Sequence, residues 1–81
     1  MKVHELKTVN PYFEDVWNLK KNFEVRKNDR HFKVGDKLKL LEVRTDGKRE
    51  RLIYVKITYI LSGGQYGIDK DYVVLGIQAL N

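Results

Sequence analysis

The hydrophobic pattern of the first third of the chain predicts a strand, a helix and a second strand. Residues 3–9 alternate imperfectly between apolar and polar side chains, which favours a short strand. Asn10 and Pro11 then supply a capping side chain and a proline suited to a first helical turn. Apolar side chains at helical spacing predict a short amphipathic helix over residues 11–20. Residues 22–27 alternate with a period of two, which predicts a strand with one charged face.

The same pattern predicts which side chains of these elements lie in the core. Phe13 and Trp17 lie on the apolar stripe of the predicted helix, and we expect both to be buried. On the strand that follows, Phe23 and Val25 point one way and the charged side chains point the other. We therefore assign Phe23 and Val25 to the core.

The middle of the chain predicts two further strands that are joined by a turn. Residues 37–44 alternate, but the apolar phase changes between Leu40 and Leu41, which predicts a β-bulge that bends the strand. Asp46-Gly47 is a strong signal for a hairpin turn. The return strand is predicted over residues 51–61.

The last strand completes an α+β pattern. Residues 72–77 are almost wholly apolar and predict a closing strand, so the element order is β-α-β-β-β-β. An open sheet of about five short strands would leave its edges unprotected, so we expect a small β-barrel with one main helix plugging an end. The remaining positions expected in the core are Leu38, Leu40, Ile53, Val55, Ile57, Val73 and Leu75.

Length and composition restrict the classes of protein. Eighty-one residues support a single domain over residues 1–81, and 42% apolar residues suit a globular fold. The lack of cysteine excludes a disulfide scaffold and a thiolate zinc site. His4 is expected to be a hydrogen-bonded structural residue. No metal, nucleotide-triphosphate or dinucleotide motif occurs, so no cofactor is expected. Without a signal-like or membrane-spanning apolar run, we expect a soluble cytoplasmic protein with no membrane partner.

The net charge of +5 comes from the middle of the chain. Residues 20–51 hold twelve Lys and Arg against six Asp and Glu, whereas the flanking segments are close to neutral. A basic patch on a small domain is the usual footprint of a polyanionic partner, most often nucleic acid. The alternative is an ordinary solvated basic surface.

Two motifs resemble a known superfamily. The run Asn-Leu-Lys-Lys-Asn-Phe-Glu-Val-Arg at residues 18–26 resembles the G-x-K-x-x-E-x-R signature of ASCH domains within the PUA-like superfamily. Leu19 stands where that signature has glycine, which normally permits a left-handed helix end. Residues 30–38 resemble the superfamily's F-x-x-G-D turn. More narrowly, the whole chain is similar to a small bacterial and phage ASCH-like domain of unknown function that is often labelled as RNA-binding.

This resemblance implies a pseudo-barrel with a cleft between the first helix and the strands, and with the motif at its mouth. It implies RNA, another nucleic acid or a modified nucleoside as the ligand. From the residues themselves, Glu24 and Arg26 leave the same strand face and can bracket one polar ligand. The Glu24 carboxylate would read a base by accepting from its N–H, and the Arg26 guanidinium would donate to phosphate or carbonyl. The alternative is an ion pair between the two, worth about 0–1 kcal/mol if it lies on the surface. The expected binding residues are Lys21, Glu24 and Arg26 in one pocket, with Lys27 and Arg30 on its rim and Tyr66, or else Tyr12, for stacking. Lys27 and Arg30 are expected to be either phosphate contacts or solvated charges.

Two competing functions stay open. Some ASCH proteins deacetylate modified cytidine nucleosides with a Lys, a Thr and a Glu, and their Thr nucleophile stands where this chain has Glu24. If the chain were such an amidohydrolase, Lys21 and Glu24 would activate a water molecule. The other alternative is a protein-interaction module without ligand chemistry. The residues favour binding over catalysis.

Overall fold

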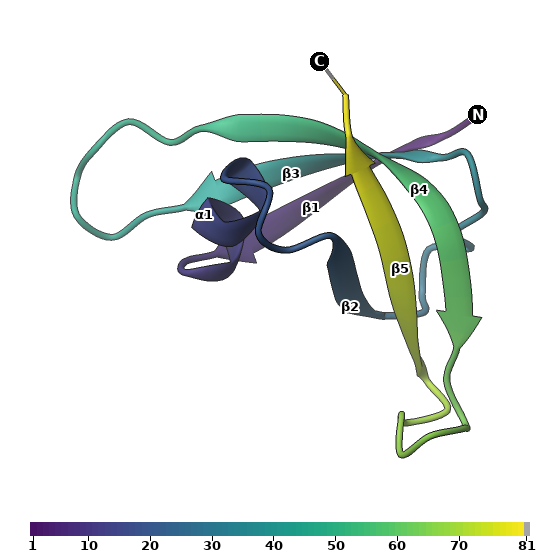
Figure 1. Ribbon diagram of the computed structural model, residues 1–81. Coiled ribbons are helices and arrows are strands. Elements are labelled where there is room, and N and C mark those ends of the chain that lie inside the picture. The colour runs from purple at the N-terminus through teal and green to yellow at the C-terminus, as the bar shows by residue number, and fades with distance from the viewer. Residues whose placement is uncertain (81) are drawn as a thin grey trace.

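The computed structural model describes residues 1–80, which form a small α+β domain (Figure 1). Within these residues the element order is that predicted by the hydrophobic pattern. The elements are β1 (Val3–Val9), α1 (Tyr12–Trp17), β2 (Phe23–Lys27), β3 (Lys37–Val43), β4 (Leu52–Ser62) and β5 (Tyr72–Ala79). The helix is shorter than predicted, and each strand lies close to its predicted position.

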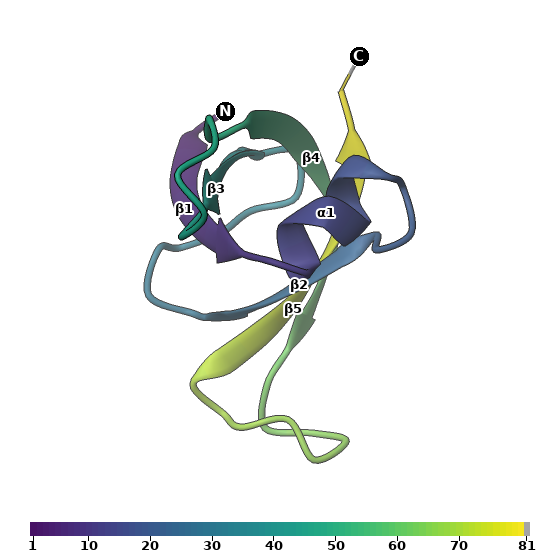
Figure 2. The same ribbon diagram turned by 90° about the vertical axis from the view of Figure 1, so that its left-hand side faces the viewer.

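The five strands make one curled sheet in the order β1-β3-β4-β5-β2. Strand β1 runs parallel to β3, and the other neighbouring strands are antiparallel. The sheet bends into a half-barrel, and α1 lies across its open end (Figure 2). Within residues 1–80, no strand pairing joins the two edges, β1 and β2, so the barrel is not closed by backbone hydrogen bonds. No helix in these residues has the length and apolar character needed to cross a membrane.

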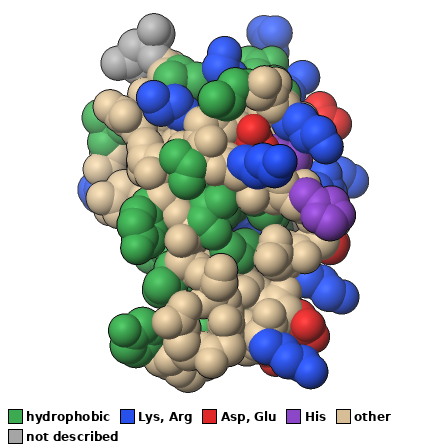
Figure 3. All heavy atoms as spheres, turned by 90° about the vertical axis from the view of Figure 1, so that its right-hand side faces the viewer, with side chains coloured by type: hydrophobic (Ala, Val, Ile, Leu, Met, Phe, Trp, Pro, Cys, Tyr) green, Lys and Arg blue, Asp and Glu red, His purple; other side chains and the backbone are tan. Residues whose placement is uncertain are grey.

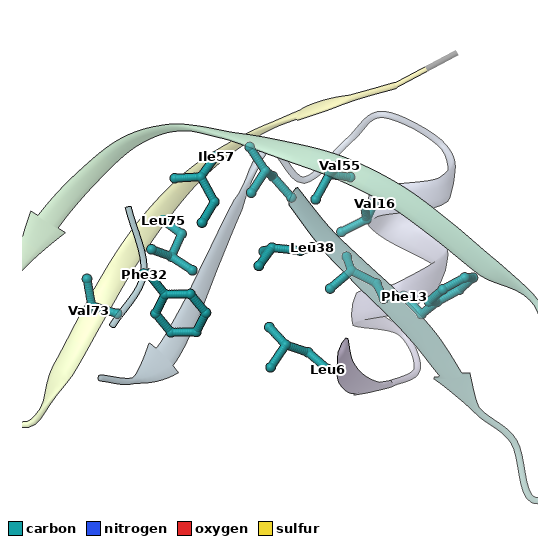
Figure 4. Close-up of a cluster of buried hydrophobic side chains, with 11 residues drawn as sticks. Leu6, Phe13, Val16, Phe32, Leu38, Val55, Ile57, Val73 and Leu75 are labelled. Carbon is teal, nitrogen blue, oxygen red and sulfur yellow. The ribbon is translucent and has the colours of Figure 1, made fainter. Parts of the chain in front are cut away.

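The concave side of the sheet holds the core (Figure 4). Seven of the predicted core positions are buried, namely Phe13, Leu38, Leu40, Val55, Ile57, Val73 and Leu75, and Ile53 packs against them while partly buried. Phe13 and Val16 of α1 enter the same cluster from the open end. Phe32, from the loop between β2 and β3, fills the other side of it.

The predicted phase of β2 is wrong. Glu24 is buried with 2% of its surface exposed, whereas Phe23 and Val25 are 44% and 52% exposed. The register explains the reversal, because Glu24 pairs with the buried Leu75 of β5 and so shares its concave side. The alternation itself was read correctly, but the charged face is the one that points inward.

The prediction that Trp17 is buried is also wrong. Its side chain is 42% exposed, while Phe13 one turn earlier is fully buried. The two rings stack with their centroids 6.0 Å apart, so Trp17 covers Phe13 from the solvent side. The Arg51 guanidinium lies 4.7 Å from the centroid of the Trp17 ring. This cation–π contact gives the outer face of the indole a partner.

The bulge predicted between Leu40 and Leu41 does not occur. The β3–β4 register runs without a break from Lys37 to Leu41, and Glu42 takes the next inward position of β3. The apparent change of phase therefore arises because the inward side chain at this position is a carboxylate. The irregularity lies in β4, between Ile57 and Tyr59. Asp46-Gly47 does lie between β3 and β4, but in a loop longer than a tight hairpin.

Asp36 holds the turn that leads into β3. Its carboxylate lies 2.9 Å from Nε2 of the buried His4 and accepts backbone hydrogen bonds from Lys2 and Lys33, each 3.2 Å long. The hydrogen bond with His4 is the main reason why the pKa of Asp36 is lowered. His4 therefore has the structural, hydrogen-bonded position that was expected of it.

Candidate functional site

The turn after α1 adopts a left-handed conformation at Leu19, whose φ is 60°. The Leu19 N–H donates to the Val16 carbonyl at 3.0 Å, and the Lys20 N–H donates to the Asp15 carbonyl at 2.8 Å. These two bonds form the Schellman arrangement in which glycine is the usual left-handed residue. Leu19 therefore adopts, at some conformational cost, a left-handed backbone geometry that glycine adopts without steric penalty.

Lys21 and Arg26 lie together at Glu24 and bond to its carboxylate. Lys21 Nζ donates to Glu24 Oε2, while Arg26 Nε and Nη2 both donate to Glu24 Oε1, at 3.1 and 2.8 Å. The Glu24 carboxylate is thus neutralised by two cations on the concave side of β2. A buried charge is stable only when it is paired in this way. Both cations are therefore bonded to Glu24. This arrangement corresponds to the ion pair expected as the alternative to ligand binding, but it is buried rather than on the surface.

Arg26 also connects the two unpaired edges of the sheet. Its Nη1 donates to the Lys7 carbonyl at 3.1 Å, and its Nη2 donates to Thr8 Oγ1 at 3.0 Å. Arg30, in the loop after β2, also bonds to β1, because its Nη1 donates to the Glu5 carbonyl at 3.1 Å. Both acceptor carbonyls belong to β1, whose outer edge has no neighbouring strand. The two arginines satisfy backbone groups that an edge strand would otherwise leave free.

A cavity of about 630 Å³ lies between β1, α1, the turn after α1 and the start of β2. We term this cavity the cleft. Its apolar lining comes from Val9, Tyr12, Phe23 and Val25, and its polar lining from Lys7, Thr8, Asp15, Lys20, Lys21 and Arg26. Glu24 is not among the described residues that line the cleft, because it lies behind Lys21 and Arg26 on the concave side.

The aromatic side chains of the cleft were only partly foreseen. Tyr12, one of two candidates for stacking, lines the cleft and is 53% exposed. Phe23 was assigned to the core and instead lines the cleft, with Lys21 Nζ 5.1 Å from its ring centroid. Alternation cannot distinguish an apolar side chain that faces a core from one that faces a cleft, so no signal in the strand pattern identified Phe23.

Three predicted rim residues lie elsewhere. Lys27 and Arg30 are exposed, and neither is among the described residues that line the cleft. Tyr66 is 84% exposed in the loop between β4 and β5, at the opposite end of the molecule from α1 in both ribbon views. The fold therefore separates Tyr66 from the cleft, although the sequence placed it with the binding residues.

A second ion cluster holds α1 on the sheet. Arg51 Nε donates to Oε1 of the buried Glu42 at 3.0 Å, and Arg51 Nη2 donates to both Glu42 Oε2 and Glu14 Oε2. Asn10 and Arg44 donate to Glu42 Oε2 as well, at 2.8 and 2.9 Å. These hydrogen bonds, led by that from Arg51, hold the pKa of Glu42 well below its usual range. The cluster joins β3 to α1 and so fixes the helix wall of the cleft.

Comparison with known proteins identifies the family of the chain but no activity. Among curated proteins, none matches the chain. The model of a family described as a domain of unknown function, DUF3850, matches residues 3–77. The matched segment includes β1, α1 and β2, and therefore all of the residues that line the cleft. Because the match extends over nearly the whole length, the chain belongs to the DUF3850 family of domains of unknown function.

Proposed function

We propose that the protein binds RNA, another single-stranded nucleic acid or a nucleoside by holding one unpaired base in the cleft. The observation that carries this proposal is the exposure of two aromatic side chains, Tyr12 and Phe23, inside a cavity bordered by cations. Aromatic faces stack on nucleobases, and each such contact is worth about 1–3 kcal/mol. A volume of about 630 Å³ is also within the usual range for small-ligand sites.

The charges around the cleft suit a phosphorylated ligand. Lys7, Lys20 and Lys21 line it together with Arg26, and the chain carries a net charge of +5. Arg26 is largely occupied by Glu24, Lys7 and Thr8. Lys21 is likewise bonded to Glu24 and to the Phe23 carbonyl, so Lys7 and Lys20 are the freer cations. In this proposal Lys7 and Lys20 contact phosphate, and Arg26 shapes the cleft and presents its remaining N–H to the ligand.

Asp15 takes the base-reading role that the sequence had suggested for Glu24. It is the one carboxylate among the described residues that line the cleft, and it forms no ion pair within residues 1–80. Tyr12 and Asp15 are three residues apart on α1 and so share a helix face. A carboxylate accepts hydrogen bonds from base N–H groups, whereas the Glu24 oxygens are already bonded to Lys21 and Arg26.

We infer further that the chain is an ASCH-type member of the PUA-like superfamily. The left-handed backbone at Leu19, where the signature has glycine, supports this inference. The position of Lys21 and Arg26 at a cleft beside the first helix supports it as well. The hydrolase alternative has no comparable support, because Glu24 is buried, fully paired and not on the cleft surface.

Binding measurements with matched variants test the proposal. Fluorescence anisotropy with short single-stranded RNA and DNA, duplex DNA and the four mononucleotides, each at two salt concentrations, gives the ligand class. Phe23→Ala and Tyr12→Ala should each weaken binding by about tenfold or more, from the loss of a stacking face. Tyr59→Ala removes an exposed aromatic side chain outside the cleft and should have no effect. Equal effects of Phe23→Ala and Tyr59→Ala would place the binding site away from the cleft.

A further inference from the structure

The outer side of β1, β3 and β4 carries a cluster of lysines. Residues that point away from the core lie side by side across these strands, with Val3 beside Lys37 and Lys37 beside Lys56. Two residues further along β1 and β3, Glu5 is beside Lys39, and Lys39 is beside Tyr54 of β4. Lys7 follows on β1. We term this surface the lysine face, and its members are Lys7, Lys37, Lys39, Lys56 and Tyr54.

The lysine face has too few carboxylates to neutralise it. Glu5 is the one acidic side chain at the outward positions of these three strands, and its carboxylate lies 3.5 Å from Lys39 Nζ. Lys37 and Lys56 are directly opposite one another, and neither forms an ion pair with a described residue. Like charges directly opposite on neighbouring strands destabilise a sheet. This face is therefore electrostatically strained in the free protein, and a polyanion would relieve the strain.

The basic side chains gather along one side of the molecule. The space-filling view shows Lys and Arg along one flank and hydrophobic side chains along the other (Figure 3). Two further lysines are exposed nearby in the chain, with Lys2 directly before β1 and Lys33 four residues before the start of β3. Tyr54 is 40% exposed among the lysines, so it offers an aromatic surface within a field of positive charge.

The lysine face is continuous with the cleft. Lys7 has an outward position on β1 and also lines the cleft, so one residue borders both surfaces. Phosphates on either side of a base held in the cleft would therefore meet the lysine face at β1. Leu41 of β3 lies directly beside Lys7, so the next cation is Lys39, one strand across and two residues back along β3.

We propose that the lysine face is the path of a single-stranded nucleic acid, which crosses β1, β3 and β4 after placing one base in the cleft. Its phosphates contact the four lysines, and one of its bases stacks on Tyr54. This inference rests on the proposed function and specifies its ligand as a polymer rather than a free nucleotide. The lysines are separate from the cleft residues except for Lys7, so the two proposals can be tested apart.

The experiment compares an eight-nucleotide single-stranded RNA with the mononucleotides on the wild-type protein and two variants. The double variant Lys37→Gln/Lys56→Gln removes two facing cations of the lysine face, neither of which lines the cleft. The matched control is Lys70→Gln combined with Lys48→Gln. These two exposed lysines lie in the β4–β5 and β3–β4 loops and are not members of the lysine face. Each phosphate contact adds about 0.7 to the slope of log affinity against log salt for single strands.

We expect the eight-mer to bind the wild-type protein more tightly than any mononucleotide. The double variant should lose about tenfold in affinity for the eight-mer at low salt, its salt slope should fall by about 1.4, and its mononucleotide affinity should stay unchanged. Its thermal stability should rise slightly, because the facing charges are gone. This opposition between a gain in stability and a loss in binding is not expected of a structural defect.

Three results would overturn the inference. They are an eight-mer that binds no better than a mononucleotide, a double variant that behaves like the control pair, and a poly-glutamate of equal charge that competes as well as the eight-mer. Failure of the proposed function looks different. In that case Phe23→Ala leaves eight-mer and mononucleotide binding intact, whatever the effect of the lysine variants.

Discussion

Arg26 Nη1 on β2 donates a hydrogen bond to the carbonyl oxygen of Lys7 on β1 at 3.1 Å, and this contact joins the two free edges of the half-barrel. The same guanidinium binds Glu24, so the link between the edges is anchored on a buried carboxylate. The cleft lies at this junction and is lined by both Lys7 and Arg26. Arg26 therefore contributes both to the cleft and, together with Arg30, to the contact between the two edges.

Replacing Arg26 should cost stability as well as binding. Arg26→Ala leaves Glu24 buried with Lys21 as its remaining partner, and breaking a buried ion pair from one side costs about 3 kcal/mol. Urea denaturation measures the loss in the free energy of unfolding. Arg26→Lys keeps the charge but not the fork of donors, and it should recover only part of the loss. Equal stability of Arg26→Ala and the wild-type protein would contradict the bridging role.

The left-handed residue after α1 gives a prediction of opposite sign. Leu19→Gly should raise the free energy of unfolding by about 1 kcal/mol, because glycine adopts a φ of 60° without steric cost. The side chain is 75% exposed, so little packing is lost. Leu19→Ala is the control, since alanine keeps the Cβ and should bring no such gain. Thermal denaturation of the wild-type protein and the two variants measures the difference in stability. Equal stability of the glycine and alanine variants would show that the backbone at Leu19 is not strained.

Asp15 and Glu24 should respond differently when each is neutralised. Asp15→Asn should change which mononucleotide binds best while leaving stability nearly unchanged, because Asp15 lines the cleft without an ion-pair partner. Glu24→Gln should mainly destabilise the fold, because it removes the shared acceptor of Lys21 and Arg26. Affinity for the four mononucleotides and urea midpoints separate the two effects. A change of base preference in Glu24→Gln alone would restore the original assignment.

Stability should fall in acid through two carboxylates with lowered pKa values. Asp36 and Glu42 have unfolded reference pKa values of 3.8 and 4.5, and the pKa of each is lower in the folded state. Their contribution is therefore fully present above about pH 5 and is lost as the pH falls below the unfolded values. Melting temperature measured from pH 7 to pH 2 should show this decline.

Two variants assign the acid dependence. Asp36→Asn and Glu42→Gln should each lower the melting temperature at pH 7 and make the decline between pH 5 and pH 2 shallower. The cause is that the substituted group no longer titrates. A full-sized decline in both variants would assign the acid sensitivity to other carboxylates.

Much of the fold was determined by the sequence alone. The periodic apolar positions predicted one helix and the strands in their observed order, and seven of the predicted core residues are buried. The shared face of Glu24 and Arg26 also followed from short-range spacing, because a strand sends every second side chain to the same face. Lys21 precedes β2 at the opposite parity, and its bond to Glu24 was not contained in that spacing.

Tertiary structure decided which face of each element points inward. Alternation has two equivalent phases, and a buried carboxylate such as Glu24 or Glu42 reverses the usual choice when cations from distant segments neutralise it. Those partners are set by strand register, which no local pattern contains. For the same reason the sequence could not show that Phe23 lines a cleft or that Tyr66 lies far from it. The positions of both depend on how the two edges of a curled sheet come together.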